Sequence, residues 1–143
     1  MAAGFSIETS KITEFKLKIQ EISREKLTTD LLEKKLKIDL EIDFENITNE
    51  LVEFIKKMEP FGINNFSPVF KSESVEILET KTVGSDGKHI KLKLKQNNNI
   101  FDAIWFNAKR EILENKKVDI VYTIDENVWN NKTTIQLNIK DIV

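Results

Sequence analysis

Residues 88–95 read Lys-His-Ile-Lys-Leu-Lys-Leu-Lys, the clearest strand pattern in the sequence. Apolar residues alternate with histidine and lysine at a period of two, which is the period at which side chains change face along a β-strand. We expect Ile90, Leu92 and Leu94 to point into a core, and His89 and the lysines to point outward. The stretch therefore predicts a half-buried strand whose outer face carries a row of positive charge.

Four further segments around this strand predict a barrel. Residues 74–83 precede it across Gly84-Ser85-Asp86-Gly87, where glycine supplies the positive φ of a tight hairpin. Downstream, the pattern predicts strands over residues 100–106, 117–125 and 132–142, a short helix over 108–114 and a turn at Asn130-Asn131. Five short strands with a helix between the third and fourth are typical of the OB-fold barrel. A five-stranded sandwich or an open meander is the competing architecture.

The first 59 residues follow a different pattern. Apolar residues at helical spacing predict an amphipathic helix over residues 11–27 and a second helix over 47–58, which Pro60 and Gly62 end. Between them, residues 36–44 alternate apolar and charged side chains, which predicts a half-buried strand. The predicted fold class is α+β: a helix–strand–helix segment in residues 1–59, then a five-stranded OB-fold barrel in residues 60–143, with the boundary near 60–68.

Composition narrows the classes of protein that fit. The chain has 143 residues and no cysteine, so disulfides and thiolate metal sites are excluded. It also has no apolar run long enough to span a membrane. Residues 1–7 lack the basic start and apolar stretch of a secretory signal. These features suit a cytoplasmic protein.

The net charge of −2 hides a local excess of positive charge. Residues 88–117 hold eight of the 22 Lys and Arg residues. A local basic patch is what a nucleic-acid groove requires, although a lysine-rich strand is often only a solvated face.

No catalytic or metal-binding constellation stands out in the sequence. His89 is the single histidine, and no nucleophile signature accompanies it. The four glycines do not have the spacing of a phosphate-binding loop. Asp39, Glu41 and Asp43 fall on one face of a predicted strand, which is more typical of a solvated face than of a cation site. We expect no catalytic residue, no metal site and no cofactor in this chain.

The outer face of the barrel is the candidate site for single-stranded DNA. Lysines two residues apart lie about 7 Å apart, close to the spacing of phosphates along an extended strand. If Ile104 and Phe106 point inward, Trp105 points outward as a stacking platform, and Trp129 offers a second platform at the last turn. The candidate DNA-binding residues are Lys88, His89, Lys91, Lys93, Lys95, Trp105, Lys109, Arg110 and Trp129.

Each of these assignments has a structural alternative. Trp105 can instead pack under the short helix as part of the core, because tryptophan usually buries most of its surface. For the same reason Trp129 can be an anchor for its loop. His89 fits a phosphate or water partner better than a metal ligand, because no second ligand accompanies it.

Several stretches, in order along the chain, resemble the RecJ family of single-stranded-DNA-specific exonucleases. The stretch from Glu59 to Phe70 is the most specific, and Asn64 and Asn131 stand where that family usually has glycine. The resemblance rests on Ala2-Ala3-Gly4-Phe5, Glu59-Pro60-Phe61-Gly62-Ile63-Asn64-Asn65-Phe66-Ser67-Pro68-Val69-Phe70, Asp86-Gly87-Lys88-His89-Ile90-Lys91-Leu92, Asp102-Ala103-Ile104-Trp105-Phe106, and Asn127-Val128-Trp129-Asn130-Asn131 with Gln136 and Asp141-Ile142.

The resemblance implies the C-terminal portion of such an exonuclease: the tail of the DHH-associated domain, then the OB domain. It implies a parent enzyme that degrades single strands from 5′ to 3′ in DNA repair and recombination. The catalytic DHH domain, which holds Mn²⁺ or Mg²⁺ in that family, is expected to lie outside this chain. We expect a monomer that binds single-stranded DNA without sequence preference. The alternative is a protein-docking module that recruits a single-strand-binding protein or a helicase.

Overall fold

The computed structural model describes residues 4–32, 35–84, 87–108 and 116–143. These residues form two compact units, Met1–Leu36 and Lys37–Val143. The division falls N-terminal to the boundary that the sequence predicts near residues 60–68, because the second predicted helix packs into the core of the barrel unit. Of the helix predicted over 108–114, all but Ala108 lies outside the described residues.

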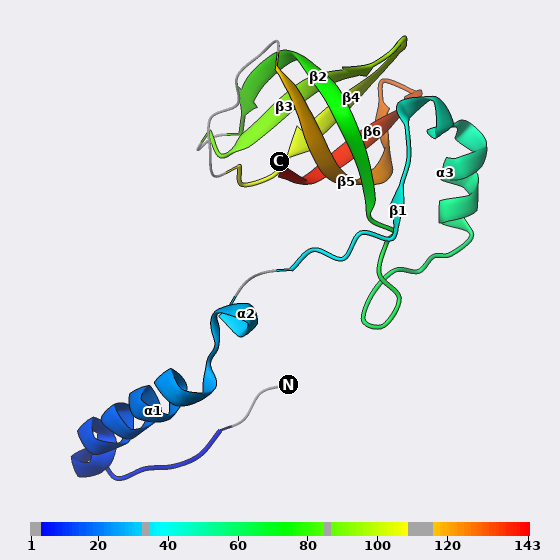
Figure 1. The fold of residues 1–143 in the computed structure, drawn as a ribbon. Helices are drawn as coiled ribbons and strands as arrows, with labels where there is room; N and C mark the ends of the chain where they lie inside the picture. The colour runs from blue at the N-terminus through cyan, green and yellow to red at the C-terminus, as the bar shows by residue number, and fades with distance from the viewer. Residues whose placement is uncertain (1–3, 33–34, 85–86, 109–115) are drawn as a thin grey trace. The chain divides into compact units, whose positions relative to one another are not determined.

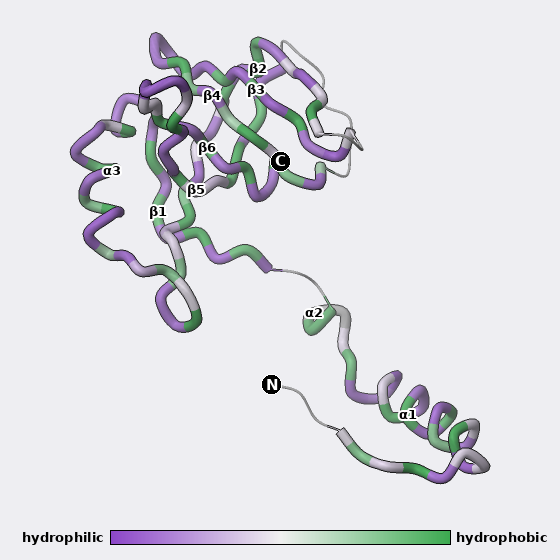
Figure 2. Tube along the Cα trace, turned by 180° about the vertical axis from the view of Figure 1, so that it is seen from behind, coloured by the Kyte–Doolittle hydropathy of each residue, from purple (hydrophilic) through white to green (hydrophobic). Residues whose placement is uncertain are grey.

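The first unit is helical. It contains the short helix η1 (Thr9–Lys11), then α1 (Ile12–Lys26) and α2 (Thr29–Leu32). Helix α1 confirms the helix predicted over residues 11–27, and Figure 2 shows hydrophobic and hydrophilic residues alternating around its turns. Among the helices in the described ranges, none has the length and apolar character needed to span a membrane.

Five strands of the second unit close into a barrel (Figure 1). Their order is β2-β3-β4-β6-β5, and a pairing of β2 with β5 completes the ring; β4 and β6 run parallel, and the other neighbours run antiparallel. This closed order is that of an OB-fold barrel and excludes the sandwich and the open meander. The strands are β2 (Phe70–Val83), β3 (His89–Gln96), β4 (Asn99–Trp105), β5 (Lys117–Trp129) and β6 (Lys132–Ile142).

A bulge in β2 allows this one strand to pair with both β3 and β5. Its first half pairs with β5 and its second half pairs with β3, and the register shifts between Ser72 and Val75. Ser74 takes a positive φ of 53° there, and its backbone N–H donates to the Asp119 carboxylate at 3.0 Å. Bulges bend a strand and increase its twist, which is what closing a small barrel requires.

The strand predicted over residues 36–44 is much shorter in the structure. Only β1 (Leu40–Glu41) pairs, in parallel with the start of β2. Residues 37–39 lie outside any strand, although the Asp39 backbone N–H donates to the Val69 carbonyl at 2.8 Å. The Asp39 carboxylate in turn accepts from the Val69 N–H at 3.1 Å, a hydrogen bond that, with Lys37, lowers the pKa of Asp39. The apolar side chains of Leu36, Ile38 and Leu40 are exposed, so the prediction of a half-buried strand was wrong here.

Helix α3 (Asn49–Lys56) covers one side of the barrel, after the short helix η2 (Phe44–Asn46). Thr48 caps α3, because its hydroxyl accepts from the Leu51 backbone N–H. Val52 and Ile55 are buried against the barrel. Phe54 of the same helix is exposed.

A buried glutamine joins the segment before α3 to the barrel. The Gln96 side-chain oxygen accepts from the Phe44 backbone N–H at 2.6 Å. Its amide nitrogen donates to the Asp43 carboxylate at 3.0 Å and to the Glu73 carbonyl at 2.8 Å. Asp43 and Asp39 therefore bind protein groups that fix the fold, instead of forming only a solvated acidic face.

Tyr122 lies at the centre of the core and is the single tyrosine in the chain. Its hydroxyl is 2.7 Å from the Ser72 hydroxyl, which donates to the Ile42 carbonyl at 2.6 Å. Burial raises the pKa of Tyr122 from 10.0 to about 12; the hydrogen bond with Ser72 opposes this shift, and the charge of Asp43 adds to it.

We expect the native chain to show less tyrosinate absorbance than the unfolded chain between pH 10 and 12. Because the folded pKa is raised, the stabilising contribution of neutral Tyr122 is fully present below pH 10 and is lost as the pH rises toward 12. The measurement is a near-ultraviolet titration of the native chain and of the chain in urea. In the urea-unfolded chain the Tyr122 hydroxyl should titrate near pH 10. If it titrates at that same pH in the native chain, Tyr122 is not buried.

Candidate nucleic-acid interface

Strand β3 presents its lysines on the outside of the barrel, as the alternation predicts. Leu92 and Leu94 are buried, and Lys91 is exposed, with Lys93 and Lys95 half-buried on the same outward face. The charged face is therefore set by the two-residue period of residues 88–95.

Carboxylates from neighbouring strands interrupt this lysine row. Lys93 lies opposite Glu79 of β2 and opposite Asp102 of β4, and its Nζ is 3.7 Å from a Glu79 oxygen. Lys95 lies opposite Glu76. Lys91 instead lies opposite Lys81, so like charges adjoin at that end of the sheet. Positive charge is therefore concentrated around Lys91, and the predicted row of outward lysines is flanked by carboxylates at Lys93 and Lys95.

Trp105 points into the barrel, which corrects the prediction that its indole faces outward. Its side chain is 8% exposed and belongs to the core. Directly opposed residues of antiparallel strands lie on the same face of a sheet. Trp105 pairs with Ile90 and Ala103 pairs with Leu92, so the inward face of β3 fixes the inward face of β4.

Phe106 takes the outward position that the sequence predicts for Trp105. It is 53% exposed, and its ring packs edge-on against the His89 imidazole, with ring centroids 5.2 Å apart. The Asn107 backbone N–H donates to His89 Nδ1 at 3.1 Å, which fixes the imidazole beside the phenyl ring. The sequence does not single out Phe106, because residues 100–106 are apolar on both faces and only the pairing of β4 with β3 shows which face points outward.

Trp129 stands at the tip of the β5–β6 hairpin. Asn130 and Asn131 both adopt positive φ values, 47° and 58°, and Trp129 pairs with Lys132 across them. Two central residues of this kind form the hairpin turn that the Asn-Asn sequence predicts. Trp129 is 73% exposed, so its indole is not a buried anchor for the loop.

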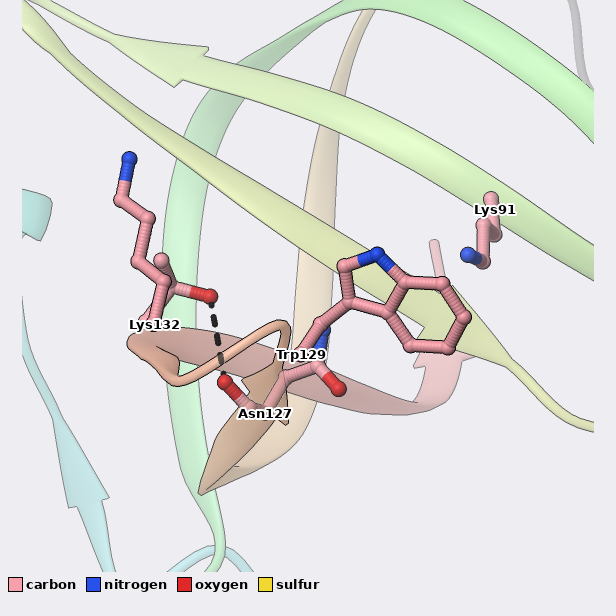
Figure 3. Close-up of a pocket in the computed structure, with 5 residues that line it drawn as sticks. Lys91, Asn127, Trp129 and Lys132 are labelled. Atoms are coloured by element: carbon pink, nitrogen blue, oxygen red, sulfur yellow. Dashed lines mark hydrogen bonds between the residues drawn. The ribbon is translucent and has the colours of Figure 1, made fainter.

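A groove of about 340 Å³ lies beside this indole (Figure 3). In Figure 3 the indole of Trp129 extends from the hairpin toward Lys91, with Lys132 on its other side. The Thr134 hydroxyl donates to the Asn127 carbonyl at 3.5 Å, which links the two strands at the edge of the groove. Its lining residues are Lys91, Asn127, Trp129, Lys132 and Thr134.

A second groove of about 230 Å³ shares Lys91 and Asn127 with the first. It crosses the outer face of β2, β3 and β4 and reaches Gln136 of β6. The two grooves together bring an indole, cationic side chains, amides and two carboxylates, Glu79 and Asp102, onto one surface. We call this surface, defined by the lining residues of both grooves, the Lys91–Trp129 surface.

The remaining candidates fall at the edge of this surface or outside the described residues. Lys88 is exposed, and its carbonyl accepts from the Ala108 N–H at 2.9 Å. Lys109 and Arg110 lie outside the described residues. Within the described ranges, no group of three or more His, Cys, Asp or Glu side chains is placed to hold a metal ion.

Comparisons with known proteins agree with this architecture. The chain is 26% identical over 144 residues to the single-stranded-DNA-specific exonuclease RecJ of Bacillus subtilis (strain 168), and 24% identical over 147 residues to that of Escherichia coli (strain K12). Each alignment covers 99% of this chain, but only 18% and 25% of the respective relatives.

The fold is shared with a solved RecJ structure. The crystal structure of RecJ in complex with Mn²⁺ from Thermus thermophilus superposes with a TM-score of 0.79 at 16% identity, over 98% of this chain and 20% of that one. The family model described as the RecJ OB domain matches residues 38–141. That match spans nearly the whole barrel unit and more than half of the chain, and the chain therefore belongs to the RecJ OB domain family.

Proposed function

We propose that this chain is the single-stranded-DNA-binding region of a RecJ-like 5′-to-3′ exonuclease that acts in DNA repair and recombination. The relatives named above are single-stranded-DNA-specific exonucleases, and the chain spans a quarter or less of their length. The nuclease chemistry, with Mn²⁺ or Mg²⁺, is accordingly assigned to other parts of the parent enzyme. The role of this chain is to hold the strand.

The main support for the proposal is an exposed indole that lies beside lysine side chains free of ion pairs and hydrogen bonds to described residues. Trp129 is 73% exposed, and among the described residues no ion pair or hydrogen bond engages the side chains of Lys91 or Lys132. OB-folds bind oligonucleotides on the face of their second and third strands and on the loop between the fourth and fifth. In this barrel those elements are β3, β4 and the β5–β6 hairpin, which is where the Lys91–Trp129 surface lies.

The proposed mechanism combines stacking with charge neutralisation. A base stacks on the indole of Trp129, and Lys81, Lys91 and Lys132 neutralise adjacent phosphates. Phe106, on the same outward side of the β3–β4 hairpin, offers a second ring for an adjacent base. Duplex DNA keeps its bases stacked inside the helix, so this arrangement favours single strands.

Replacing Lys91 with alanine tests the charge assignment. For wild-type chain and oligo-dT, three neutralised phosphates give a slope of log K against log salt of about −2. Lys91→Ala should make the slope shallower by about 0.7–1, because one phosphate contact is lost. The measurement is fluorescence anisotropy of a labelled oligo-dT over a series of salt concentrations.

Lys95→Ala is the matched control, because Lys95 lies on the same strand face but opposite Glu76. Its slope should stay close to that of the wild type. An unchanged slope for Lys91→Ala would contradict the assigned surface. Equal affinity for duplex and single strand, or no affinity for either, would instead favour a protein-docking module.

A further inference from the structure

We propose that Asp102 makes the Lys91–Trp129 surface discriminate among bases, favouring cytosine over thymine. The inference rests on the proposed function and deepens it, because stacking and phosphate contacts alone read no base edges. It assigns Asp102 as a specificity-determining residue for the bound strand.

Asp102 is placed to meet the edge of a base. It lies on the outward face of β4, between Lys93 of β3 and Gln136 of β6 in the strand register. All three residues line the second groove, which shares Lys91 and Asn127 with the groove beside Trp129. A strand that stacks one base on the indole and runs along Lys91 therefore brings a neighbouring base over Asp102.

The carboxylate of Asp102 is available to accept a hydrogen bond. Over the described part of the chain, no hydrogen bond or ion pair engages its side chain, and the nearby Lys93 ammonium is 3.7 Å from Glu79 instead. The Gln136 side chain likewise makes no hydrogen bond to a described residue. The groove therefore offers one acceptor-only group next to one amide that both donates and accepts.

These groups match cytosine and oppose thymine. The exocyclic amine of cytosine donates to a carboxylate, which is the pairing by which Asp and Glu recognise this base. The adjacent ring nitrogen and carbonyl of cytosine accept, and the Gln136 amide can donate to either. Thymine presents a carbonyl oxygen where cytosine has its amine, so a thymine bound in the same orientation loses this hydrogen bond and places its O4 against the Asp102 carboxylate, with its N3–H as the one donor on that edge.

The test compares oligo-dC and oligo-dT of equal length by fluorescence anisotropy, using the full 143-residue chain at one salt concentration. Wild-type chain should bind oligo-dC about 3- to 10-fold more tightly, the range for one hydrogen bond gained and one repulsion avoided. Asp102→Asn should bring the ratio close to one, mainly by tightening binding of oligo-dT. Circular dichroism checks that the variant is folded.

Glu76→Gln is the matched control, because it removes one negative charge from the same sheet outside both grooves. It should leave the ratio of the two affinities unchanged. Equal binding of the two oligonucleotides by wild-type chain would overturn the inference and leave the proposed function intact. An Asp102→Asn variant that binds both more tightly, with the ratio preserved, would overturn it too, because Asp102 would then only repel phosphates. Failure to bind either oligonucleotide would overturn the proposed function itself.

Discussion

Replacing Trp129 with alanine is expected to weaken binding of single-stranded DNA by about 1–3 kcal/mol, the contribution of one stacked base. That range corresponds to about a 5- to 150-fold increase in Kd. The indole is 73% exposed at a hairpin tip, so its loss removes a stacking platform and leaves the core intact. The free energy of unfolding should therefore change by less than about 0.5 kcal/mol. Anisotropy titrations with oligo-dT and urea unfolding curves give the two quantities.

Phe66→Ala provides the matched control for this variant. Phe66 is 79% exposed and aromatic, but it lies in the loop after α3 and lines neither groove of the Lys91–Trp129 surface. Its removal should leave the Kd for oligo-dT unchanged. If Trp129→Ala and Phe66→Ala have equal effects on binding, the indole has no specific role.

Replacing Trp105 with alanine should have the opposite effect: it should lower the stability of the fold instead of removing a contact to DNA. Its side chain is 8% exposed within the core of the barrel, and truncating a buried tryptophan typically costs about 3–5 kcal/mol of stability. That cost is a large part of the total stability of a domain, which is about 5–15 kcal/mol. We expect a large fall in the urea midpoint and in Tm.

The milder variant Trp105→Phe separates folding from binding. It keeps an aromatic ring in the core and should keep a wild-type Kd for oligo-dT, because Trp105 does not reach the outer surface. A stable Trp105→Ala variant that loses DNA affinity would contradict the buried placement of this indole and support the outward orientation predicted from the sequence.

The barrel could be predicted from the sequence because its strands are short, amphipathic and separated by turn residues. Residues 88–95 alternate strictly, so only one face of β3 can be buried. The turn at Asn130-Asn131 was predictable because asparagine tolerates the left-handed backbone that both positions adopt. The closing contact between β2 and β5 joins residues far apart in the sequence, and no local pattern specifies it.

The orientation of β4 could not be predicted because the strand has apolar residues on both faces. In Ile100-Phe101-Asp102-Ala103-Ile104-Trp105-Phe106, only Asp102 is polar, so alternation does not fix which residues are inside. The pairing with β3 decides it, by placing Phe101, Ala103 and Trp105 opposite the inward residues of that strand, Leu94, Leu92 and Ile90. The prediction of a strand over residues 36–44 was wrong for a related reason. Alternation indicates an extended backbone, but a strand also needs a neighbouring strand to pair with. Here β2 pairs only with Leu40 and Glu41 of this segment.

The candidate site was predicted in part. The outward lysines of β3 and the exposure of Trp129 follow from local pattern and turn chemistry. The carboxylates that flank Lys93 and the outward ring of Phe106 depend on cross-strand register, which the sequence does not state. The positive surface is therefore centred nearer the hairpin tip than the sequence indicates.

The most direct test of the Lys91–Trp129 surface is intrinsic tryptophan fluorescence during titration with oligo-dT at two salt concentrations. The chain has two tryptophans, one buried and one exposed, so Trp129→Phe leaves only the signal of Trp105. Stacking on Trp129 predicts quenching of wild-type chain that weakens at the higher salt concentration, and no quenching of Trp129→Phe. Equal quenching of both proteins, or no quenching of wild-type chain, would contradict the placement of the DNA strand on this surface.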